Sequence, residues 1–494
     1  MIYFLYYLIQ CNVLPQLPHH NREGNELRQK IKNRAQLLDH GDAESRRIVL
    51  DLAEATLQKL DAYTRIKSIL HLDGDILRIG ERTWDLSKKR NVYLIGAGKA
   101  CNAMAQAVEE VLGDRLTDGI AVIKVSEPTD IFHRTRVFVG GHPLPTPDGV
   151  AACMEIFRLV DSCGPDDLFL CVMSGGSSAL ISYPAPGLTL QDEIDTTDVL
   201  LKSGAAILEV NAVRRHISGM NGGRLAQRIE ARGAELIGFN ISDSVSNPPT
   251  ADISVPWPNF AGTPMGADQT TVADALDVIR RYCLSERLPK RVIQYLKSCG
   301  PSGETPKAFP RNTYYQVNTL PDSCAYAGEI AGKMDLPAMV LSTFVEGEAK
   351  SVGTLMADIA REIQRYHRPL SPPCVVLSCG EAVTTITDNR EIRGHGGPSQ
   401  EMAVGFAIEA AKTKGACLLS IDTEGTDGTT PAAGGMTDSQ SGARAAHLGV
   451  NLLDALRGHA SYEALCTIGD CVMTGNTGTN VCDLNIMYVP ALKE

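Results

Sequence analysis

The residues of this chain that could do most chemistry lie in the segment 393–438. Its first half, RGHGGPSQEMAVGF, joins a glycine-rich turn to the start of a helix that carries Gln400 and Glu401. After the short apolar strand CLLSI, its second half, DTEGTDGTTPAAGGMTD, forms a long loop rich in acidic residues, threonine and glycine. Ligands of open α/β sheets bind where such loops leave buried strands. We therefore expect a ligand site in this segment.

The acidic loop permits two kinds of chemistry. Its carboxylates are Asp422, Glu424, Asp427 and Asp438. Paired carboxylates act as acid and base in hydrolysis, and carboxylates also hold Mg²⁺ or accept the hydroxyl proton in phosphoryl transfer. The residues by themselves leave both alternatives open. The chain contains neither EF-hand spacing nor an HExxH motif, which excludes those two metal sites.

A second candidate is the turn Gly96-Ala97-Gly98-Lys99-Ala100 at the end of an apolar strand. Its glycines let the backbone approach an anion, the following helix N-terminus adds partial positive charge, and Lys99 could neutralise a phosphoryl group. The turn lacks the Ser or Thr that follows the lysine in a Walker A loop, and Cys101 replaces the third glycine of a GxGxxG fingerprint. A phosphate site and a plain tight turn are both compatible with it.

A third candidate follows the strand DLFLCVM. It is a run of small residues: Ser174, Gly175, Gly176, Ser177 and Ser178. Free N–H groups of such a run form an anion nest, and the hydroxyls can donate to a phosphate or a carboxylate. A nucleophilic serine would need a G-x-S-x-G frame, but the frame centred on Ser177 ends in Ala179. The run therefore favours an anion cradle.

Basic residues gather in the stretch NAVRRHIS, which contains Asn211 and Arg214. The planar guanidinium of Arg suits a carboxylate or a phosphate. A solvated helix face is the alternative, although the paired glycines Gly222 and Gly223 just beyond indicate a turn beside a site. Asp243, at the end of the strand ELIGFNI, is either the cap of the next helix or a metal ligand.

Polar residues also follow strands in the second half of the chain. Glu348 comes soon after AMVLSTFV, and Gly380 and Glu381 follow CVVLSC. These acids could bind Mg²⁺ or ribose hydroxyls, or they could cap surface helices. The loop TGNTGTN, which ends in Asn480, suits the hydroxyls of a sugar acid or forms a plain turn.

The elements that must position these residues are strands alternating with helices. Strands that are almost continuously apolar, such as NVYLIGA, indicate a doubly wound, mostly parallel sheet. Since 494 residues exceed one ordinary core, we predict two α/β domains. We expect a disordered extension (1–40), a larger Rossmann-like domain (41–297), a proline-rich linker (298–311) and a second α/β domain (312–494), with the active site in the cleft between the domains.

Composition narrows the class of protein. The net charge is −11 and Lys and Arg are dispersed, which argues against nucleic acid and anionic membranes as partners. The N-terminal apolar run is shorter than the roughly 20 residues of a membrane span, and it lacks the basic leader of a signal peptide. The 14 cysteines are scattered without a CxxC pair, which is typical of free thiols in a reducing compartment. We expect a cytoplasmic enzyme.

The order of the segments carries a resemblance. The segments IGAGKA, GGHPLPTPDG, MSGGSSAL, NAVRRHISGMNGGRLA, ISDSV, HGGPSQEMA, GTDGTTPAAGG and TGNTGTNVCDL occur in this order. Together they resemble the glycerate 2-kinase family of the two-domain class II type, whose C-terminal half is called the MOFRL domain. The resemblance implies phosphorylation of D-glycerate at its 2-hydroxyl by ATP with Mg²⁺. Some members were formerly labelled hydroxypyruvate reductases.

The resemblance also implies roles for single residues. Lys99 matches the lysine at the reacting phosphoryl group, the run that begins at Ser174 matches the loop beneath substrate or phosphate, and Arg214 matches the basic residue near the glycerate carboxylate. Pro398 and Ser399 stand where many members carry Arg-Asn, so one cation expected at the transferring phosphate is missing here. Pro431 stands where relatives often carry an aspartate.

We accordingly assign three sets of site residues. The catalytic set is Lys99, Asp427 and Arg214. Substrate binding is expected from the run Ser174, Gly175, Gly176, Ser177 and Ser178, with Asn211 and Asn480. ATP binding is expected from Gly96, Gly98, Glu348, Gly380, Glu381, Gln400 and Glu401, and Mg²⁺ binding from Asp243 and Asp427.

The expected partners are a small sugar acid and ATP, and a homodimer is the candidate assembly. The alternatives are a kinase for another sugar acid, a hydroxypyruvate reductase, and an inactive sugar-acid-binding protein.

Overall fold

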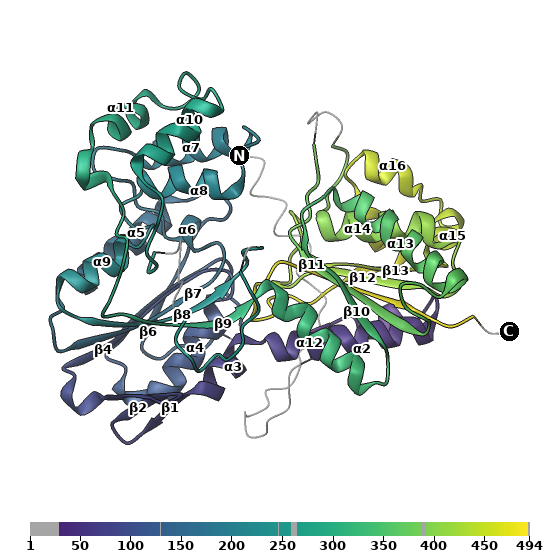
Figure 1. The fold of residues 1–494 in the computed structure, drawn as a ribbon, viewed down its shortest axis with the longest axis horizontal. Helices are drawn as coiled ribbons and strands as arrows, with labels where there is room; N and C mark the ends of the chain where they lie inside the picture. Colours follow the sequence, from purple (N-terminus) through teal and green to yellow (C-terminus); the bar gives the residue numbers. More distant parts are fainter. Residues whose placement is uncertain (1–28, 129, 246, 258–263, 387–391, 493–494) are drawn as a thin grey trace.

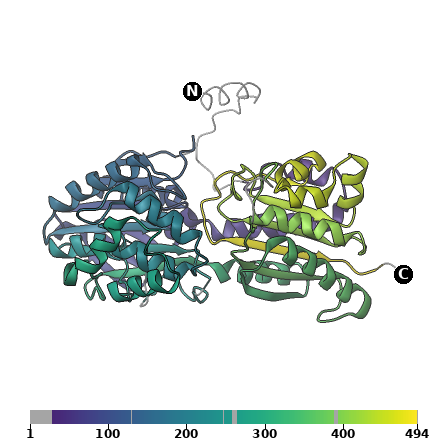
Figure 2. The same cartoon turned by 90° about the horizontal axis from the view of Figure 1, so that it is seen from above.

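The computed structural model describes residues 29–128, 130–245, 247–257, 264–386 and 392–492. Within these residues the chain forms two lobes, each built around a six-stranded sheet (Figure 1). Figure 2 shows the same lobes side by side from above. The expected mixed α/β fold with two domains is thereby confirmed.

The first sheet is parallel throughout, with the strand order β6-β5-β4-β7-β8-β9. Its strands are β4 (Asn91–Ala97), β5 (Asp118–Ile123), β6 (Thr135–Val139), β7 (Asp167–Met173), β8 (Glu235–Ser242) and β9 (Thr313–Thr319). The central strands are buried over almost their whole length. Helices therefore cover both faces, as parallel sheets require.

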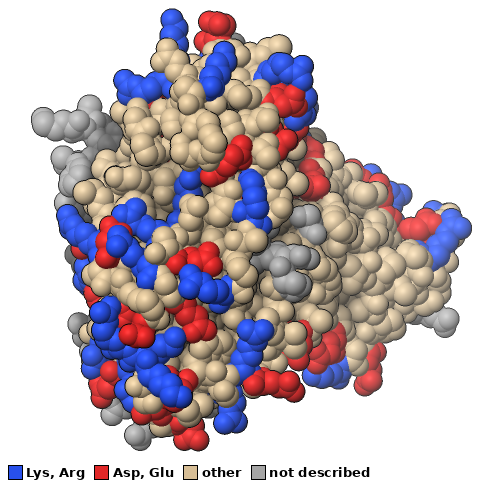
Figure 3. Space-filling view, turned by 60° about the vertical axis from the view of Figure 1, so that its left-hand side comes forward, with Lys and Arg blue, Asp and Glu red and all other residues tan. Residues whose placement is uncertain are grey.

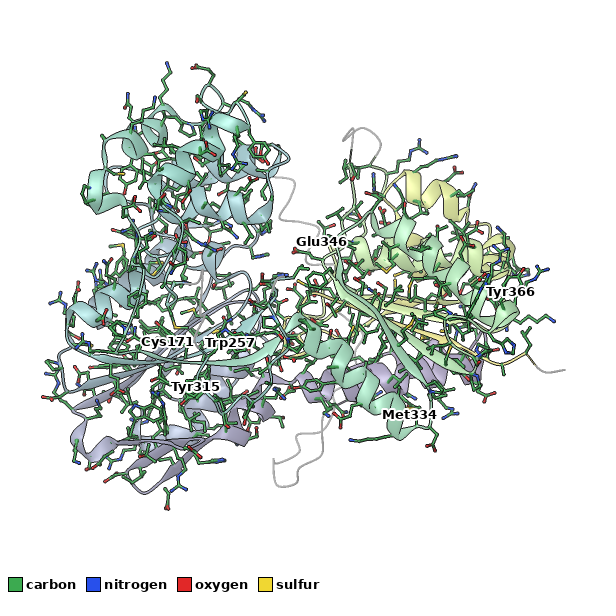
Figure 4. The ribbon with its side chains drawn as sticks, viewed as in Figure 1. Cys171, Trp257, Tyr315, Met334, Glu346 and Tyr366 are labelled. Carbon is green, nitrogen blue, oxygen red and sulfur yellow. The ribbon has the colours of Figure 1, made fainter. Side chains whose placement is uncertain are left out.

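One face of the first sheet packs against α3 (Ala62–Ile69), α4 (Cys101–Leu112) and a small sheet of β1 (Leu70–Asp73), β2 (Ile76–Ile79) and β3 (Arg82–Asp85). The other face packs against α5 (Pro147–Asp161), α6 (Ser177–Leu180) and α9 (Arg224–Ala231). Figure 4 labels Cys171 and Tyr315, which belong to these two opposite cores. Short 3₁₀ turns are η1 (Leu86–Lys88), η2 (Gly113–Arg115) and η3 (Gly300–Gly303).

A separate group of helices stands above this lobe in Figure 1 and has its own apolar core. Its members are α7 (Leu190–Leu201), α8 (Ile207–His216), α10 (Val272–Arg281) and α11 (Lys290–Ser298). Because α8 carries Arg214, this group brings a basic residue toward the end of the sheet.

The second sheet is mixed, with the order β10-β11-β15-β12-β13-β14. Its strands are β10 (Ala338–Val345), β11 (Cys374–Gly380), β12 (Cys417–Asp422), β13 (Gly434–Asp438), β14 (Cys471–Val472) and β15 (Asp483–Val489). Only β10 and β11 pair in parallel among the described strands of this sheet. In Figure 4, Glu346 marks the end of β10 that faces the first lobe.

Two layers of helices enclose the second sheet. In Figure 1, α2 (Ala43–Leu60) and α12 (Leu320–Lys333) lie below it, with α1 (Arg34–Leu38) beside α2. Above it lie α13 (Ala349–Tyr366), α14 (Pro398–Ala410), α15 (Ser441–His447), α16 (Leu452–Arg457) and α17 (Ser461–Ile468). The helix α14 is buried on nearly all sides.

The domains do not follow the expected ranges along the chain. The strand β9, expected in the second domain, pairs with β8 and completes the first sheet. The helix α2, expected in the first domain, packs against β12, β15 and α12 of the second. Residues 29–40, expected in a disordered extension, contain the helix α1 (Arg34–Leu38) and the buried side chains of Ile31 and Leu37. Residues 1–28 lie outside the described residues. Both reassignments depend on contacts distant in sequence.

The expectations from composition concern the surface charges, the cysteines and the hydrophobicity of the helices. Lys and Arg are interspersed with Asp and Glu on the face seen in Figure 3. The cysteines of the described part are free thiols. Of the helices described, none combines the length and the apolar character that crossing a membrane requires.

Candidate active site

The glycine turn after β4 and the serine-glycine run after β7 brace each other. The Lys99 N–H donates to the Gly175 carbonyl at 2.9 Å, and the Ala100 N–H donates to Ser174 Oγ at 3.0 Å. Gly98 has φ +131, and a Cβ there would lie 2.2 Å from Ser174 Oγ. The two loops therefore need glycine at this point, and the Ser174 hydroxyl is occupied by the start of α4.

Gly175 meets a residue from each domain. A Cβ at Gly175 would lie 1.6 Å from Asp243 Oδ2 and 2.3 Å from Asn480 Nδ2. Asn480, which is 1% exposed, donates from Nδ2 to Asp243 Oδ2 at 3.2 Å. Three of the predicted site residues thus come together, although they lie far apart in sequence.

A carboxylate of the second domain joins two lysines of the first. Glu424 Oε2 lies 2.6 Å from Lys99 Nζ, and Glu424 Oε1 lies 2.7 Å from Lys124 Nζ. The side chain of Glu424 is 5% exposed, that of Lys99 17% and that of Lys124 28%. Because Lys99 and Lys124 follow the neighbouring strands β4 and β5, the parallel sheet itself sets this pair beside the acidic loop.

The charges at this contact are strongly coupled. Burial works against the charged form of Lys99, but Asp422, Glu424 and Asp243 outweigh it and raise the pKa of Lys99. Burial also opposes ionisation of Glu424, yet Lys99 and Lys124 lower its pKa to about 2. Burial and the nearby Glu424 raise the pKa of Asp422 to about 7. At neutral pH Lys99 and Glu424 are therefore charged, whereas Asp422 is poised to exchange a proton.

His142 lies against the same loop. A Cβ at Gly176 would lie 2.9 Å from Cδ2 of the His142 ring and 3.1 Å from Cγ of Lys99. Burial, together with the positive charges of Lys99 and Lys124, lowers the pKa of His142 to about 4. The imidazole is consequently neutral at pH 7 and can exchange hydrogen bonds with a bound hydroxyl without adding charge.

Arg214 forms no ion pair with any residue that the structure describes. Its Nη1 donates a long hydrogen bond of 3.4 Å to Asn211 Oδ1. Burial lowers its pKa, while the negative charge of Glu193 acts in the opposite direction. Its charge also acts on His142. The neighbouring Arg215, by contrast, pairs with Asp268 at 3.1 Å. Arg214 is thus a cation available to an anionic ligand.

Asp427 holds the start of α14. Its carboxylate accepts from the N–H groups of Ser399 (3.3 Å) and Gln400 (2.8 Å) and from Gln400 Nε2 (3.0 Å). The side chain is 2% exposed, and burial raises its pKa to about 7. A Cβ at Gly397 would lie 2.3 Å from this carboxyl group. Asp427 is therefore engaged with α14, which argues against direct contact with a reacting hydroxyl.

Gln400 and Glu401 are also engaged within the second domain. Gln400 is fully buried, and Glu401 Oε1 lies 2.8 Å from Nδ1 of His459. Ser399 Oγ donates to Asp483 Oδ1 at 3.1 Å. These placements argue against the expected contact of Gln400 and Glu401 with a nucleotide. The contacts of Gln400 with Asp427 and of Glu401 with His459 could not be read from the sequence, because they join residues 27 and 58 positions apart.

The remaining candidates have structural contacts of their own. A Cβ at Gly96 would lie 2.6 Å from Cys101 Sγ, and one at Gly380 would lie 2.2 Å from the Val345 carbonyl. Glu348 accepts from Thr385 Oγ1 at 2.8 Å. These residues pack the ends of their strands.

Three further candidates lie beside the contact already described. Ser177 begins the single-turn helix α6, and the Ser178 carbonyl accepts from Asn221 Nδ2 at 3.2 Å. Desolvation and the charge of Asp243 raise the pKa of Glu381, so this acid lies near the contact with the first domain.

Sequence reasoning missed Lys124 and His142 and gave no defined role to Asp422. Lys124 directly follows β5, just as Lys99 closely follows β4. A lysine at the carboxyl end of this second strand could therefore have been predicted as a site residue from the sequence. His142 stands in the quoted turn GGHPLPTPDG, and Asp422 opens the acidic loop. Their proximity to Lys99 depends on strand order, which the sequence does not state.

No group of three or more His, Cys, Asp or Glu side chains in the described part of the chain is arranged to hold a metal ion by itself. Asp243 and Asp422 nevertheless lie close enough to Lys99 to act on its charge. Mg²⁺ is usually held by one or two carboxylates together with substrate phosphates. Asp243 and Asp422 fit a Mg²⁺ site of this kind, in which the phosphates of the substrate supply the remaining ligands.

Two family descriptions match the chain. Residues 48–297 match the domain of unknown function DUF4147, and residues 374–483 match the MOFRL family. A glycerate 2-kinase of Pyrococcus horikoshii is 33% identical over 90% of this chain and 97% of its own length. A provisionally named hydroxypyruvate reductase of Agrobacterium vitis is 35% identical over 80% of this chain and 98% of its own length.

The fold is likewise shared. The crystal structure of a glycerate kinase from Thermotoga maritima superposes with a TM-score of 0.72 at 29% identity, covering 90% of this chain and 99% of that one. With this fold and these relatives, the chain belongs to the glycerate 2-kinase family, with a DUF4147 domain followed by a MOFRL domain.

Proposed function

We propose that this enzyme transfers the γ-phosphoryl group of ATP to the 2-hydroxyl of D-glycerate, giving 2-phosphoglycerate and ADP. The names of its relatives support a kinase. The observation that carries the proposal is the contact of Lys99 and Lys124 with Glu424, because it puts two cations of one domain against the acidic loop of the other. Phosphoryl transfer needs such preorganised positive charge more than it needs a nucleophile.

In this proposal Arg214 binds the carboxylate of glycerate. Its guanidinium has no ion partner among the described residues and is close enough to act on the charge of His142. A carboxylate ligand would satisfy it with charge-assisted hydrogen bonds. Asn211 lies beside it and can orient it. The neutral His142 would then hydrogen-bond a substrate hydroxyl.

Lys99 would stabilise the charge that develops on the transferring phosphoryl group, and Lys124 would act as a second cation. Lys124 would supply the positive charge that the family resemblance leads us to expect at the position of Pro398. Pro398 is the first residue of α14, where a missing N–H does no harm, and it has no charge to offer.

Mg²⁺ bound with ATP would neutralise negative charge on the phosphates. Asp243 and Asp422 are the residues that would hold it, since both lie near Lys99. Asp427 is better suited to position α14.

The test is an ADP-release assay over D-glycerate and four-carbon sugar acids, with phosphorus NMR to identify the phosphorylated carbon. We expect the highest kcat/KM with D-glycerate and phosphate at carbon 2. ADP release with a different acid alone would identify another sugar-acid kinase. NADH oxidation by hydroxypyruvate without ADP release would replace the proposal by a reductase, and tight acid binding without either reaction would indicate an inactive binding protein.

We also propose that the enzyme is cytoplasmic, because its described cysteines are free thiols. We further propose that it forms a homodimer through β10. The edge strand β10 exposes Val340 (46%), Leu341 (40%) and Phe344 (64%). A long apolar edge pairs readily with another strand, and a two-fold axis would place a second β10 antiparallel to the first. Sedimentation should show a dimer that Phe344→Asp converts to a monomer. A monomeric wild-type enzyme would contradict this assembly.

A further inference from the structure

Two cysteines of the second domain approach each other at the end of α17. The Sγ atoms of Cys466, in α17, and Cys471, in β14, lie 2.9 Å apart. Gly469, with φ +78, ends α17 and turns the chain back, so the two side chains meet. Cys466 is exposed, whereas Cys471 is 4% exposed. The arrangement is a reachable thiol with a buried thiol directly behind it.

The neighbouring groups favour the thiolate form of Cys466. The hydrogen bond from Cys471 lowers the pKa of Cys466 to about 7, and Tyr462 contributes in the same direction, while partial burial and the charge of Glu463 oppose both. The hydrogen bond to Cys466, burial and the nearby Asp470 raise the pKa of Cys471. Since the thiolate is the nucleophile in thiol oxidation, Cys466 would attack an oxidant first.

Other cysteines of the described part lack this combination. Cys324 and Cys379 hydrogen-bond each other, but they are 1% and 0% exposed in the core between α12 and β11. Cys283 is exposed and has no thiol partner among the described residues. Cys466 is both exposed and in contact with a second thiol, that of Cys471.

We propose that Cys466 and Cys471 form a modification site at which hydroperoxides produce a reversible disulfide. The Cys466 thiolate attacks a peroxide oxygen, so that an S–O bond forms and the O–O bond breaks, and the departing hydroxide or alkoxide takes up a proton. Cys471 then attacks the Cys466 sulfur, an S–S bond forms, and the sulfenic oxygen leaves as water. The two thiols lose two electrons and two protons, and the peroxide is reduced to water and an alcohol, or to two waters.

The test treats the full-length protein with hydrogen peroxide under native conditions, blocks free thiols by alkylation and maps the peptides by mass spectrometry. We expect the segment that contains Cys466 and Cys471 to lose two hydrogen atoms and to regain them with dithiothreitol. Without oxidant, Cys466 should alkylate at pH 7 about tenfold faster than Cys283, because the lowered pKa of Cys466 increases its thiolate fraction.

Three variants separate the roles. Cys466→Ser should abolish the cross-link, and Cys471→Ser should leave a sulfenic acid on Cys466 that dimedone traps. Cys283→Ser, the matched loss of an exposed thiol, should leave the cross-link intact. The proposal is overturned if wild-type Cys466 and Cys471 stay reduced while Cys283 is oxidised, or if they become linked only after denaturation. The wild-type measurements decide the matter even where the Cys471 variant does not fold.

Discussion

Replacing Lys99 tests the proposed phosphoryl site most directly. Lys99→Met removes one of the two cations that contact Glu424 and keeps most of the side-chain volume. At 2.6 Å and an effective dielectric of about 20, a pair of unit charges interacts with about 6 kcal/mol. Only the part of such an interaction that grows toward the transition state contributes to kcat.

The expected loss of activity follows from the part of the Lys99 interaction that grows toward the transition state. Removing one preorganised donor from a developing anion commonly costs 10²–10³ in kcat, or about 2.7–4 kcal/mol. We expect Lys99→Met to fall in this range, with a tenfold loss, about 1.4 kcal/mol, as the minimum. The change in KM for glycerate should be small, because Arg214 provides that contact in our proposal.

The variant should remain folded. Glu424 keeps Lys124 at 2.7 Å, so the substitution should cost less than the roughly 3–5 kcal/mol of a buried charge left wholly unpaired. Lys89→Met is a matched control, since Lys89 is 18% exposed and pairs with Glu235 at 3.0 Å, outside the site. The assay is steady-state ADP release with thermal unfolding measured in parallel. Unchanged turnover in folded Lys99→Met would refute the assigned role.

Three further predictions concern substrate binding, pH and the domain contact. Arg214→Ala should raise KM for D-glycerate about tenfold or more, since a hydrogen bond to a charged group is worth about 1.5–3 kcal/mol; an equal effect from Arg215→Ala would exclude a specific role. Asp427 has its pKa raised to about 7, so native protein retains a proton that unfolded protein releases near pH 4. The free energy of unfolding should therefore fall as pH rises from about 4 to about 7, by up to about 1.4 kcal/mol per pH unit from this group. In urea titrations Asp427→Asn should flatten that slope, and an identical slope would show that Asp427 does not titrate there. Gly175→Ala should destabilise the protein by about 1–3 kcal/mol through overpacking, whereas Gly347→Ala, whose new methyl would meet its nearest neighbour at 3.7 Å, should unfold nearly as wild type; similar melting of both variants would argue against the tight contact at Gly175.

Much of the local structure could be predicted from the sequence. Runs such as NVYLIGA and DLFLCVM predict buried strands, because burial on both faces demands apolar residues at every position. The glycines and Lys99 at the end of β4 indicate a place where a backbone and a cation can approach an anion. These features depend on neighbours within a few residues, so the chain displays them directly.

Only the tertiary structure decided which of these residues meet. The strand β9 joins the first sheet and α2 joins the second domain because their apolar faces pack best against elements distant in the chain. Lys124 reaches Glu424 because β5 lies beside β4.

Tertiary packing also decided the role of α14 in the segment 393–438. Gln400 and Glu401 had the composition of a ligand site, yet Asp427 and His459 engage them inside the second domain. Residue type and spacing determined what chemistry was available, whereas long-range packing determined which side chains remained free to perform it.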